Sequence, residues 1–269
     1  MAESRSPPHA EFRLVAAILD RIIETKRSEV VQLRKQRPTV RFSPRAVKLK
    51  RSPGDPLRIL AEIKFRSPSA GALSTELSVS ERAKAYERGG ASVVSVLCDS
   101  TFFGGAYEHL IEARDNCSLP LLCKEFVIDE VQLDWAHACG ADLVLLIARC
   151  VGPEELVRLH AAALERNLTP LVEIANHEEA GWARALPEPI IGVNARDLDN
   201  LQMDSQRASD VLSQLGPSLT RLHLSGIKTP EDVTRTQNSG VDGALIGEIL
   251  MRDANPEARL RSLVQAAHP

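Results

Sequence analysis

The stretch GADLVLLI at residues 140–147 decides the fold, because it joins a helix-ending glycine to a short strand. Its glycine can take the left-handed conformation that ends a helix. Residues 143–147 are apolar throughout, as expected for a strand that is covered on both faces of a parallel sheet. The same arrangement recurs as GASVVSVL at 90–97 and GVDGALI at 240–246. The sequence therefore repeats one unit, in which a helix is followed by a glycine and a buried strand.

Short apolar runs occur along the whole chain, at residues 59–63, 93–97, 121–123, 143–147, 171–174, 190–193, 222–224 and 244–246. Their starts lie about 20 to 34 residues apart, which leaves room for one helix and two short loops. Helices are predicted at residues 80–88, 107–114, 153–166, 177–185, 205–215, 230–237 and 256–266. An open doubly wound sheet more often has about five to seven strands and a Gly-x-Gly-x-x-Gly turn, which this sequence lacks. We therefore predict an α/β fold, a (β/α)8 TIM barrel.

An additional N-terminal helix is indicated by the spacing of Leu14, Ile18, Ile22 and Val30. A minimal barrel does not need this helix, so we expect it to cap one end. Residues 41–56 hold three prolines among basic residues and are predicted to be a linker into the first strand. Residues 1–10 have no periodicity and are predicted to be a disordered tail. Residues 11–269 are predicted to form a single barrel domain, with an N-terminal extension at 11–57.

Composition excludes several classes of protein. The 269 residues, 43% of them hydrophobic, can form one sizeable core. A net charge of -3, from 33 basic and 36 acidic residues, argues against a nucleic-acid partner. The five cysteines include no Cys-x-x-Cys pair and indicate reduced thiols rather than disulfides or a zinc site. The longest apolar run, residues 143–148, is far shorter than the about 20 residues that span a bilayer. We expect a soluble cytoplasmic protein without a membrane partner.

Polar residues gather where the predicted strands end, and barrel enzymes build their active sites at that end. They are Glu62, Lys64, Lys124, Glu125, Glu173, Asn194 and Arg196. One such residue alone is more often part of a structural ion pair, but several at one end indicate a site. The last two strands end in Ser225-Gly226 and Gly247-Glu248. Barrels frequently bind phosphate with backbone N–H groups there, although tight turns are the alternative.

A family resemblance rests on several motifs. The sequence Ala61-Glu62-Ile63-Lys64, which leads to Ser67-Pro68-Ser69, is similar to the first-strand motif of the indole-3-glycerol phosphate synthase family. Further matches follow in the family's order at residues 95–97, 102–105, 122–126, 171–173, 191–194 and 196–198. The resemblance extends from residues 18–23 to 250–252, nearly the whole chain. Shared order and spacing make a chance match improbable.

The resemblance implies a carboxy-lyase of tryptophan biosynthesis, which is an aromatic amino acid pathway. Its substrate would be 1-(2-carboxyphenylamino)-1-deoxyribulose 5-phosphate, a phosphorylated small molecule. Ring closure, decarboxylation and dehydration would yield indole-3-glycerol phosphate. No organic cofactor and no metal are implied. We expect a monomer, and association with other tryptophan-pathway enzymes is left open.

The resemblance also implies residue roles. Lys124 would be the general acid and Glu62 the ion-pair partner that holds it in place. Lys64 would contact phosphate and assist dehydration, and Glu173 would be the base that restores aromaticity. The residues that position the anthranilate ring and its carboxylate would be Ser67, Asn194 and Arg196. Phe103 and Phe126 would pack on the ring, or else are ordinary core aromatics.

One departure from the family pattern is Leu224, which stands where a substrate-facing glutamate is expected before Ser225. One alternative is therefore a non-catalytic or re-specialised phosphate-binding barrel of the same lineage. A second alternative, a phosphoribosylanthranilate isomerase, would be expected to use a Cys and Asp pair. The presence of Lys64, Lys124 and Glu173 argues against the first alternative, and the two lysines together with Ser67-Pro68-Ser69 argue against the second.

Overall fold

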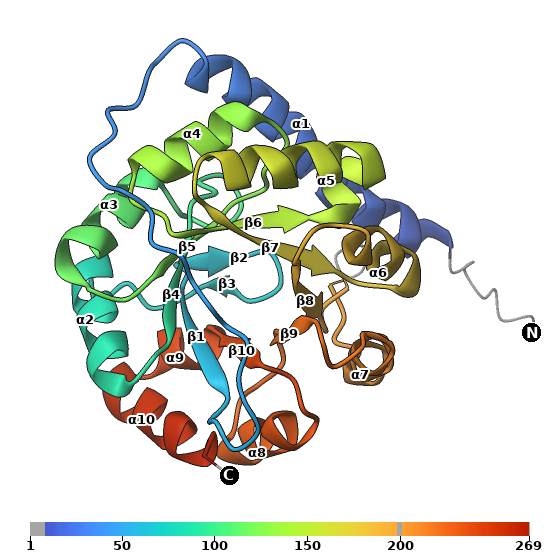
Figure 1. Ribbon diagram of the computed structural model, residues 1–269. Helices are drawn as coiled ribbons and strands as arrows, with labels where there is room; N and C mark the ends of the chain where they lie inside the picture. The colour runs from blue at the N-terminus through green and yellow to red at the C-terminus, as the bar shows by residue number, and fades with distance from the viewer. Residues whose placement is uncertain (1–8, 198–200, 269) are drawn as a thin grey trace, which may run out of the picture.

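The computed structural model describes residues 9–197 and 201–268 and shows eight parallel strands closed into a barrel (Figure 1). The barrel strands are β1 (Arg58–Ile63), β4 (Val93–Leu97), β5 (Leu121–Lys124), β6 (Leu143–Ile147), β7 (Thr169–Ile174), β8 (Ile190–Asn194), β9 (Thr220–Leu224) and β10 (Gly243–Ile246). Each contains one of the eight predicted runs. Because β1 pairs with both β4 and β10, the sheet has no free edge, and the predicted barrel is confirmed.

The helices that surround the barrel are α2 (Val79–Gly89), α3 (Tyr107–Asn116), α4 (Glu130–Ala138), α5 (Ala148–Glu165), α6 (His177–Arg184), α7 (Ser205–Gln214), α8 (Pro230–Asn238) and α10 (Pro256–Ala266). All seven predicted helices are present. Helix α5 begins before its predicted start, because the chain is already helical ahead of a kink at Gly152. Helix α4 was not predicted, although Asp129 and Gln132 form a capping box at its start.

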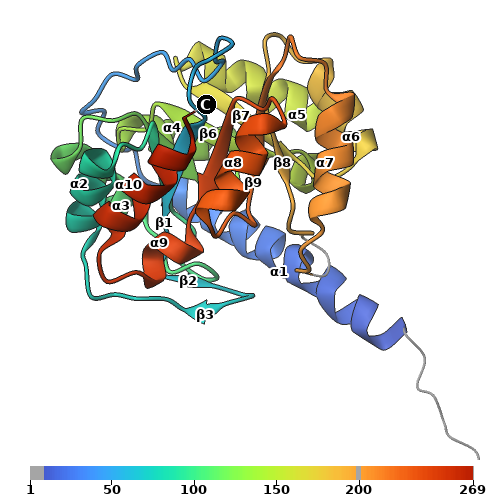
Figure 2. The same cartoon turned by 90° about the horizontal axis from the view of Figure 1, so that it is seen from below.

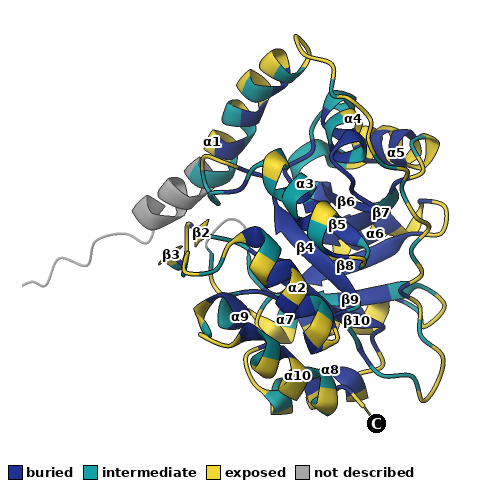
Figure 3. Ribbon diagram, turned by 90° about the vertical axis from the view of Figure 1, so that its left-hand side faces the viewer, coloured by how far each residue is buried: buried dark blue, intermediate teal, exposed yellow. Residues whose placement is uncertain are grey.

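The strands are buried on both faces, and Figure 3 shows them in dark blue. Leu60, Leu122 and Leu145 belong to the cluster of side chains inside the barrel. Ile59 and Ala61, which alternate with Leu60 along β1, belong to the larger cluster beneath the helices. This two-sided burial explains why the strands have continuous apolar sequences rather than alternating ones.

The linker at residues 41–56 contains no helix or strand, as predicted, and hydrogen bonds tie it to the residues that directly precede β6 and β10. Asp142 lies in the stretch that decided the fold, and Asp242 holds the equivalent place in the third copy. The Asp142 carboxylate accepts a 2.8 Å hydrogen bond from the backbone N–H of Arg45. The Asp242 carboxylate accepts one of 3.1 Å from Arg51. The repeated unit therefore supplies both the strands and two anchors for the linker.

The additional N-terminal helix is α1 (His9–Leu33), which runs beside α4 and extends beyond the barrel (Figures 1 and 2). Ile22 and Val30 are buried, as the amphipathic pattern predicted. The predicted tail at residues 1–10 lies outside the described residues as far as residue 8, and His9 begins the helix. Across residues 9–197 and 201–268, no helix is both long enough and apolar enough to span a bilayer.

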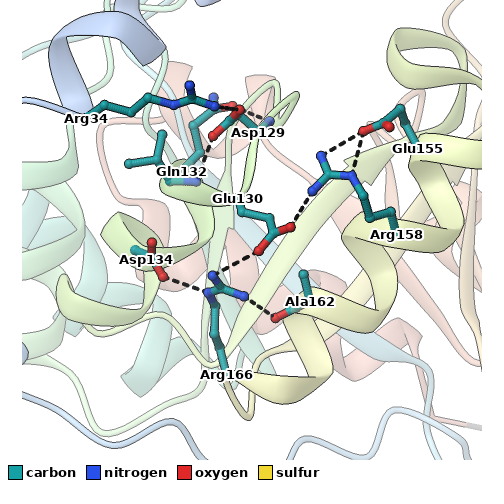
Figure 4. A network of polar contacts seen from close by, with 10 residues as sticks. Arg34, Asp129, Glu130, Gln132, Asp134, Glu155, Arg158, Ala162 and Arg166 are labelled. Carbon is teal, nitrogen blue, oxygen red and sulfur yellow. Dashed lines mark hydrogen bonds and ion pairs between the residues drawn. The ribbon is translucent and has the colours of Figure 1, made fainter.

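Ion pairs join α1, α4 and α5 on the outer surface (Figure 4). Arg34, which directly follows α1, lies 2.5 Å from Asp129, which caps α4. Glu130 on α4 pairs with Arg158 of α5 and with Arg166, which caps the end of α5. Pairs at such exposed positions each contribute less than about 1 kcal/mol, so this network supports the helix packing without determining it.

Candidate active site

A cavity of about 320 Å3 lies at the carboxyl ends of the barrel strands, and every site residue that the sequence predicted lines it. These residues are Glu62, Lys64, Ser67, Phe103, Lys124, Phe126, Glu173, Asn194, Arg196, Ser225, Gly226, Gly247 and Glu248. The barrel closure brings them together from opposite ends of the chain. Among the residues that the structure describes, no cluster of His, Cys, Asp or Glu side chains is arranged to hold a metal ion.

Two lysine–glutamate pairs face the cavity. Lys64 Nζ lies 2.5 Å from Glu62 Oε1, and Lys124 Nζ lies 3.2 Å from Glu173 Oε2. The predicted pairing of Glu62 with Lys124 is therefore wrong, because Glu62 contacts Lys64. The reason is local: residues two apart along an extended strand point to the same side, so Glu62 and Lys64 are neighbours by construction.

Lys124 is set in surroundings that favour its charged form. Burial lowers the pKa of Lys124, but the carboxylates of Glu173 and Glu62 outweigh burial and raise the pKa above its ordinary value. Glu173 is held from its other side by Asn194, whose Nδ2 donates a 2.8 Å hydrogen bond to Glu173 Oε1. Both Glu173 and Asn194 are buried. Lys124 can therefore donate a proton next to a fixed carboxylate.

Part of the wall and of the floor of the cavity is apolar. The rings of Phe103 and Phe126 lie 5.7 Å apart between centroids, with their planes tilted by 37°. Both rings line the cavity, and Phe126 also packs into the cluster inside the barrel. Leu145 and Leu245 form part of the floor and were not predicted, because residues within the apolar strands give no sequence signal that separates floor from core. A flat apolar ligand fits against this surface.

A small hairpin, β2 (Arg66–Ser67) with β3 (Gly71–Ala72), brings Ser67 to the cavity. Figure 2 shows it at the same end of the barrel as α1. The backbone N–H of Arg66 donates a 3.1 Å hydrogen bond to the Phe103 carbonyl, which ties the hairpin to the loop after β4. The hairpin was not predicted, since each of its strands has only two residues.

The opposite side of the cavity is formed by the loops after β9 and β10. Ser225 and Gly226 have φ angles of 70° and 88°, a left-handed conformation that costs a serine free energy and is common at functional sites. Gly247 precedes the short helix α9 (Glu248–Arg252), whose first turn has N–H groups without helical partners. Such groups are suited to binding an anion.

Gly247 leaves room for Glu62. A Cβ atom at position 247 would lie 2.6 Å from Glu62 Oε1 and 3.1 Å from Glu62 Cβ. We expect Gly247→Ala to displace the Glu62 carboxylate from Lys64 and to raise KM for the expected phosphorylated substrate about tenfold. The free energy of unfolding should fall by about 1–2 kcal/mol. Steady-state kinetics and urea unfolding measure the two effects. An unchanged KM would show that Glu62 and Lys64 do not need this spacing.

Glu125 follows Lys124 and is also buried at the cavity. Burial raises the pKa of Glu125 to about 7; Lys26 opposes this rise, and Asp99 adds to it. Because the folded chain holds this proton more tightly than the unfolded chain, Glu125 destabilises the fold progressively as the pH rises from its unfolded pKa, 4.5, to about 7.

The free energy of unfolding should therefore fall by about 1–3 kcal/mol more in the unchanged protein than in Glu125→Gln between pH 5 and 7.5. Urea unfolding at several pH values measures this difference. Parallel pH curves for the two proteins would show that Glu125 is not the titrating group.

Leu224 lies inside the barrel, where its side chain packs against Gly192 of β8. It is 1% exposed and is not among the residues that line the cavity. The space that a glutamate would occupy on this strand is filled by an apolar side chain.

Comparison with known proteins gives one consistent family. The model of the family described as indole-3-glycerol phosphate synthase matches residues 19–263. The indole-3-glycerol phosphate synthase of Bacillus cereus (strain ATCC 10987 / NRS 248) is 36% identical over 242 residues, 90% of this chain and 95% of that protein. The synthase of Bacillus mycoides (strain KBAB4) is 35% identical with the same coverage.

Two solved structures share the fold. Thiamine phosphate pyrophosphorylase from Pyrococcus furiosus has a TM-score of 0.58 at 15% identity, covering 78% of this chain and 95% of that one. 3-Hexulose-6-phosphate synthase from Salmonella typhimurium has a TM-score of 0.62 at 14% identity, covering 78% and 98%. At these identities the likeness concerns the barrel alone.

Proposed function

Because this chain belongs to the indole-3-glycerol phosphate synthase family, whose enzymes serve tryptophan biosynthesis, we propose that it is a carboxy-lyase acting on 1-(2-carboxyphenylamino)-1-deoxyribulose 5-phosphate. The reaction closes the indole ring and releases carbon dioxide and water, giving indole-3-glycerol phosphate. The proposal includes a monomeric enzyme in the cytoplasm. A cofactor has no part in it.

The observation that carries this proposal is the pair of lysine–glutamate contacts in one cavity with an aromatic wall. Lys124–Glu173 and Lys64–Glu62 supply two acids and two carboxylates from three different strands. Phe103 and Phe126 form an apolar surface beside them. Condensation of an aromatic carbon with a ketone needs this combination of proton donor, proton acceptor and flat apolar surface.

Lys124 is the general acid in this proposal. It protonates the ketone oxygen while the ring carbon attacks the carbonyl carbon. The contact of Lys124 with Glu173 supports this role, because it fixes the charged ammonium group at the cavity. The carboxyl group of the ring leaves as carbon dioxide, and the electron pair of the broken bond returns to the ring system.

Glu173 is the base that removes the last ring proton and restores aromaticity. Its contacts with Lys124 and Asn194 support this role, since they fix the carboxylate at the cavity. Lys64 contacts the phosphate and assists the loss of water. Glu62 then orients Lys64 rather than Lys124, in line with the 2.5 Å contact.

The substrate is held at both ends in this proposal. The side chains of Ser67, Asn194 and Arg196 position the anthranilate carboxylate and ring. The phosphate lies at the loops after β9 and β10, formed by Ser225, Gly226, Gly247 and Glu248. Leu224 offers no carboxylate to the hydroxyl groups between the two ends, so we expect weaker substrate binding rather than loss of the reaction.

The decisive experiment mixes the purified protein with 1-(2-carboxyphenylamino)-1-deoxyribulose 5-phosphate and follows indole fluorescence over time. A steady rise supports the synthase function and shows that Leu224 is tolerated. If the folded protein binds the substrate and no fluorescence appears, the proposed activity is wrong, and a non-catalytic or re-specialised barrel of this lineage takes its place.

A further inference from the structure

Lys26 of α1 is a charged side chain that is completely buried, and the proposed reaction does not use it. Its Nζ lies 2.7 Å from Asp99 Oδ2, 2.9 Å from Glu125 Oε1 and 2.8 Å from Glu29 Oε2. Asp99 and Glu125 are buried as well. A buried ion pair costs desolvation free energy, so a cluster of this kind rarely adds stability in proportion to its contacts. Its place in the fold suggests another use.

Each of the two buried carboxylates also holds the backbone of an aromatic residue in the cavity wall. Asp99 Oδ1 accepts hydrogen bonds from the backbone N–H groups of Phe102 and Phe103, at 2.6 and 2.9 Å. Glu125 Oε1 accepts one of 2.7 Å from the N–H of Phe126. Lys26 therefore contacts two carboxylates, and each carboxylate holds the backbone of one phenylalanine of the aromatic pair.

The two carboxylates come from the loops that follow two neighbouring strands, which are paired as far as Leu97 and Lys124 and are joined by a 3.0 Å hydrogen bond from the Cys98 N–H to the Lys124 carbonyl. Asp99 follows β4, and Glu125 follows β5. Lys26 lies on α1, which a minimal barrel does not need. A single ammonium group from outside the barrel thus joins the two loops beneath the aromatic wall.

We propose that Lys26 is a positioning residue, which fixes Phe103 and Phe126 relative to each other so that the cavity binds the aromatic part of its ligand. This inference rests on the proposed function for the identity of the ligand. Lys26 touches neither substrate nor product; it acts through Asp99 and Glu125. The N-terminal helix then belongs to the ring-binding half of the site, while the phosphate half is built without it.

The test compares two ligands that share a phosphate and differ in the ring. Indole-3-glycerol phosphate carries the ring, and glycerol 3-phosphate lacks it. In Lys26→Met, a change that keeps the side-chain length and removes the charge, we expect Kd for indole-3-glycerol phosphate to rise about tenfold. Kd for glycerol 3-phosphate should change less than about twofold, because the phosphate loops are untouched. Calorimetric titration of the folded variant measures both constants.

Arg34→Met is the control, since Arg34 directly follows α1 and joins this end of the helix to Asp129 at the surface, outside the cavity. Both Kd values should match those of the unchanged protein. If Lys26→Met does not fold, Asp99→Asn takes its place, because it breaks the contact with Lys26 and keeps an oxygen for the Phe103 N–H. The same ring-specific loss is expected there.

Equal weakening of both ligands, or no weakening of either, would overturn the positioning role. The two Kd values of the unchanged protein distinguish this result from a failure of the proposed function. If it binds the two ligands equally, the ring has no site and the proposed function fails. If it prefers indole-3-glycerol phosphate and the folded variant keeps that preference, only the role of Lys26 is wrong.

Discussion

Replacing Lys124 with alanine is expected to lower turnover of 1-(2-carboxyphenylamino)-1-deoxyribulose 5-phosphate by roughly 10²- to 10⁴-fold, about 3–5 kcal/mol of barrier. The reason is the loss of the proposed proton donor. Among the described residues, Lys124 is the one charged group that contacts Glu173 in the cavity. KM should change modestly, because the ring wall and the phosphate loops remain. Indole fluorescence, with the rate expressed per folded molecule by circular dichroism, measures the effect.

Lys50→Ala is the control for this change. Lys50 also pairs with a buried carboxylate, that of Asp242, but at the opposite end of the barrel. Turnover per folded molecule should remain that of the unchanged protein. Near-normal turnover in Lys124→Ala would remove Lys124 from the role of general acid and would direct attention to Lys64.

Glu173→Gln is expected to lower kcat by about 10²- to 10³-fold while the barrel still folds. Glutamine keeps an oxygen for the hydrogen bond from Asn194, but it cannot take a proton and turns an N–H toward Lys124. Substrate should therefore bind and react slowly. Single-turnover kinetics separate binding from product formation, and circular dichroism reports the fold.

Glu179→Gln provides the comparison, because Glu179 is an equally buried glutamate shortly after the same strand and does not line the cavity. It pairs with Arg149 and accepts a hydrogen bond from the backbone of Ala175. We expect a loss of stability and an unchanged kcat. If Glu173→Gln loses stability and keeps its kcat in the same way, Glu173 is a structural charge and not the base.

Much of the candidate site could be predicted from the sequence for a simple geometric reason. A parallel barrel places the ends of all its strands on one ring, so a polar residue that closes an apolar run must lie near the others. Lys124, Glu173 and Asn194 follow this rule. The partner of Glu62 did not follow from it, because the rule gives the end of the barrel on which a side chain lies and not its nearest neighbour.

Some features left a local signal that could have been used. The capping box of Asp129 and Gln132 marks the start of α4. The short hairpin that carries Ser67 left no signal, since two residues per strand are too few for a pattern. Lys26 also left no signal, because a lysine on an amphipathic helix is usually solvated and nothing near it in the sequence indicates burial.

The sequence by itself determined the barrel, the additional N-terminal helix, the linker at residues 41–56 and the family, because these depend on the order of apolar runs, glycines and motifs along the chain. Only the tertiary structure decided which charges are partners. Glu173 pairs with Lys124, and Lys26 pairs with Asp99 and Glu125. The physical reason is that an ion pair depends on distances of a few ångströms between side chains from separate elements, and closure of the barrel sets those distances.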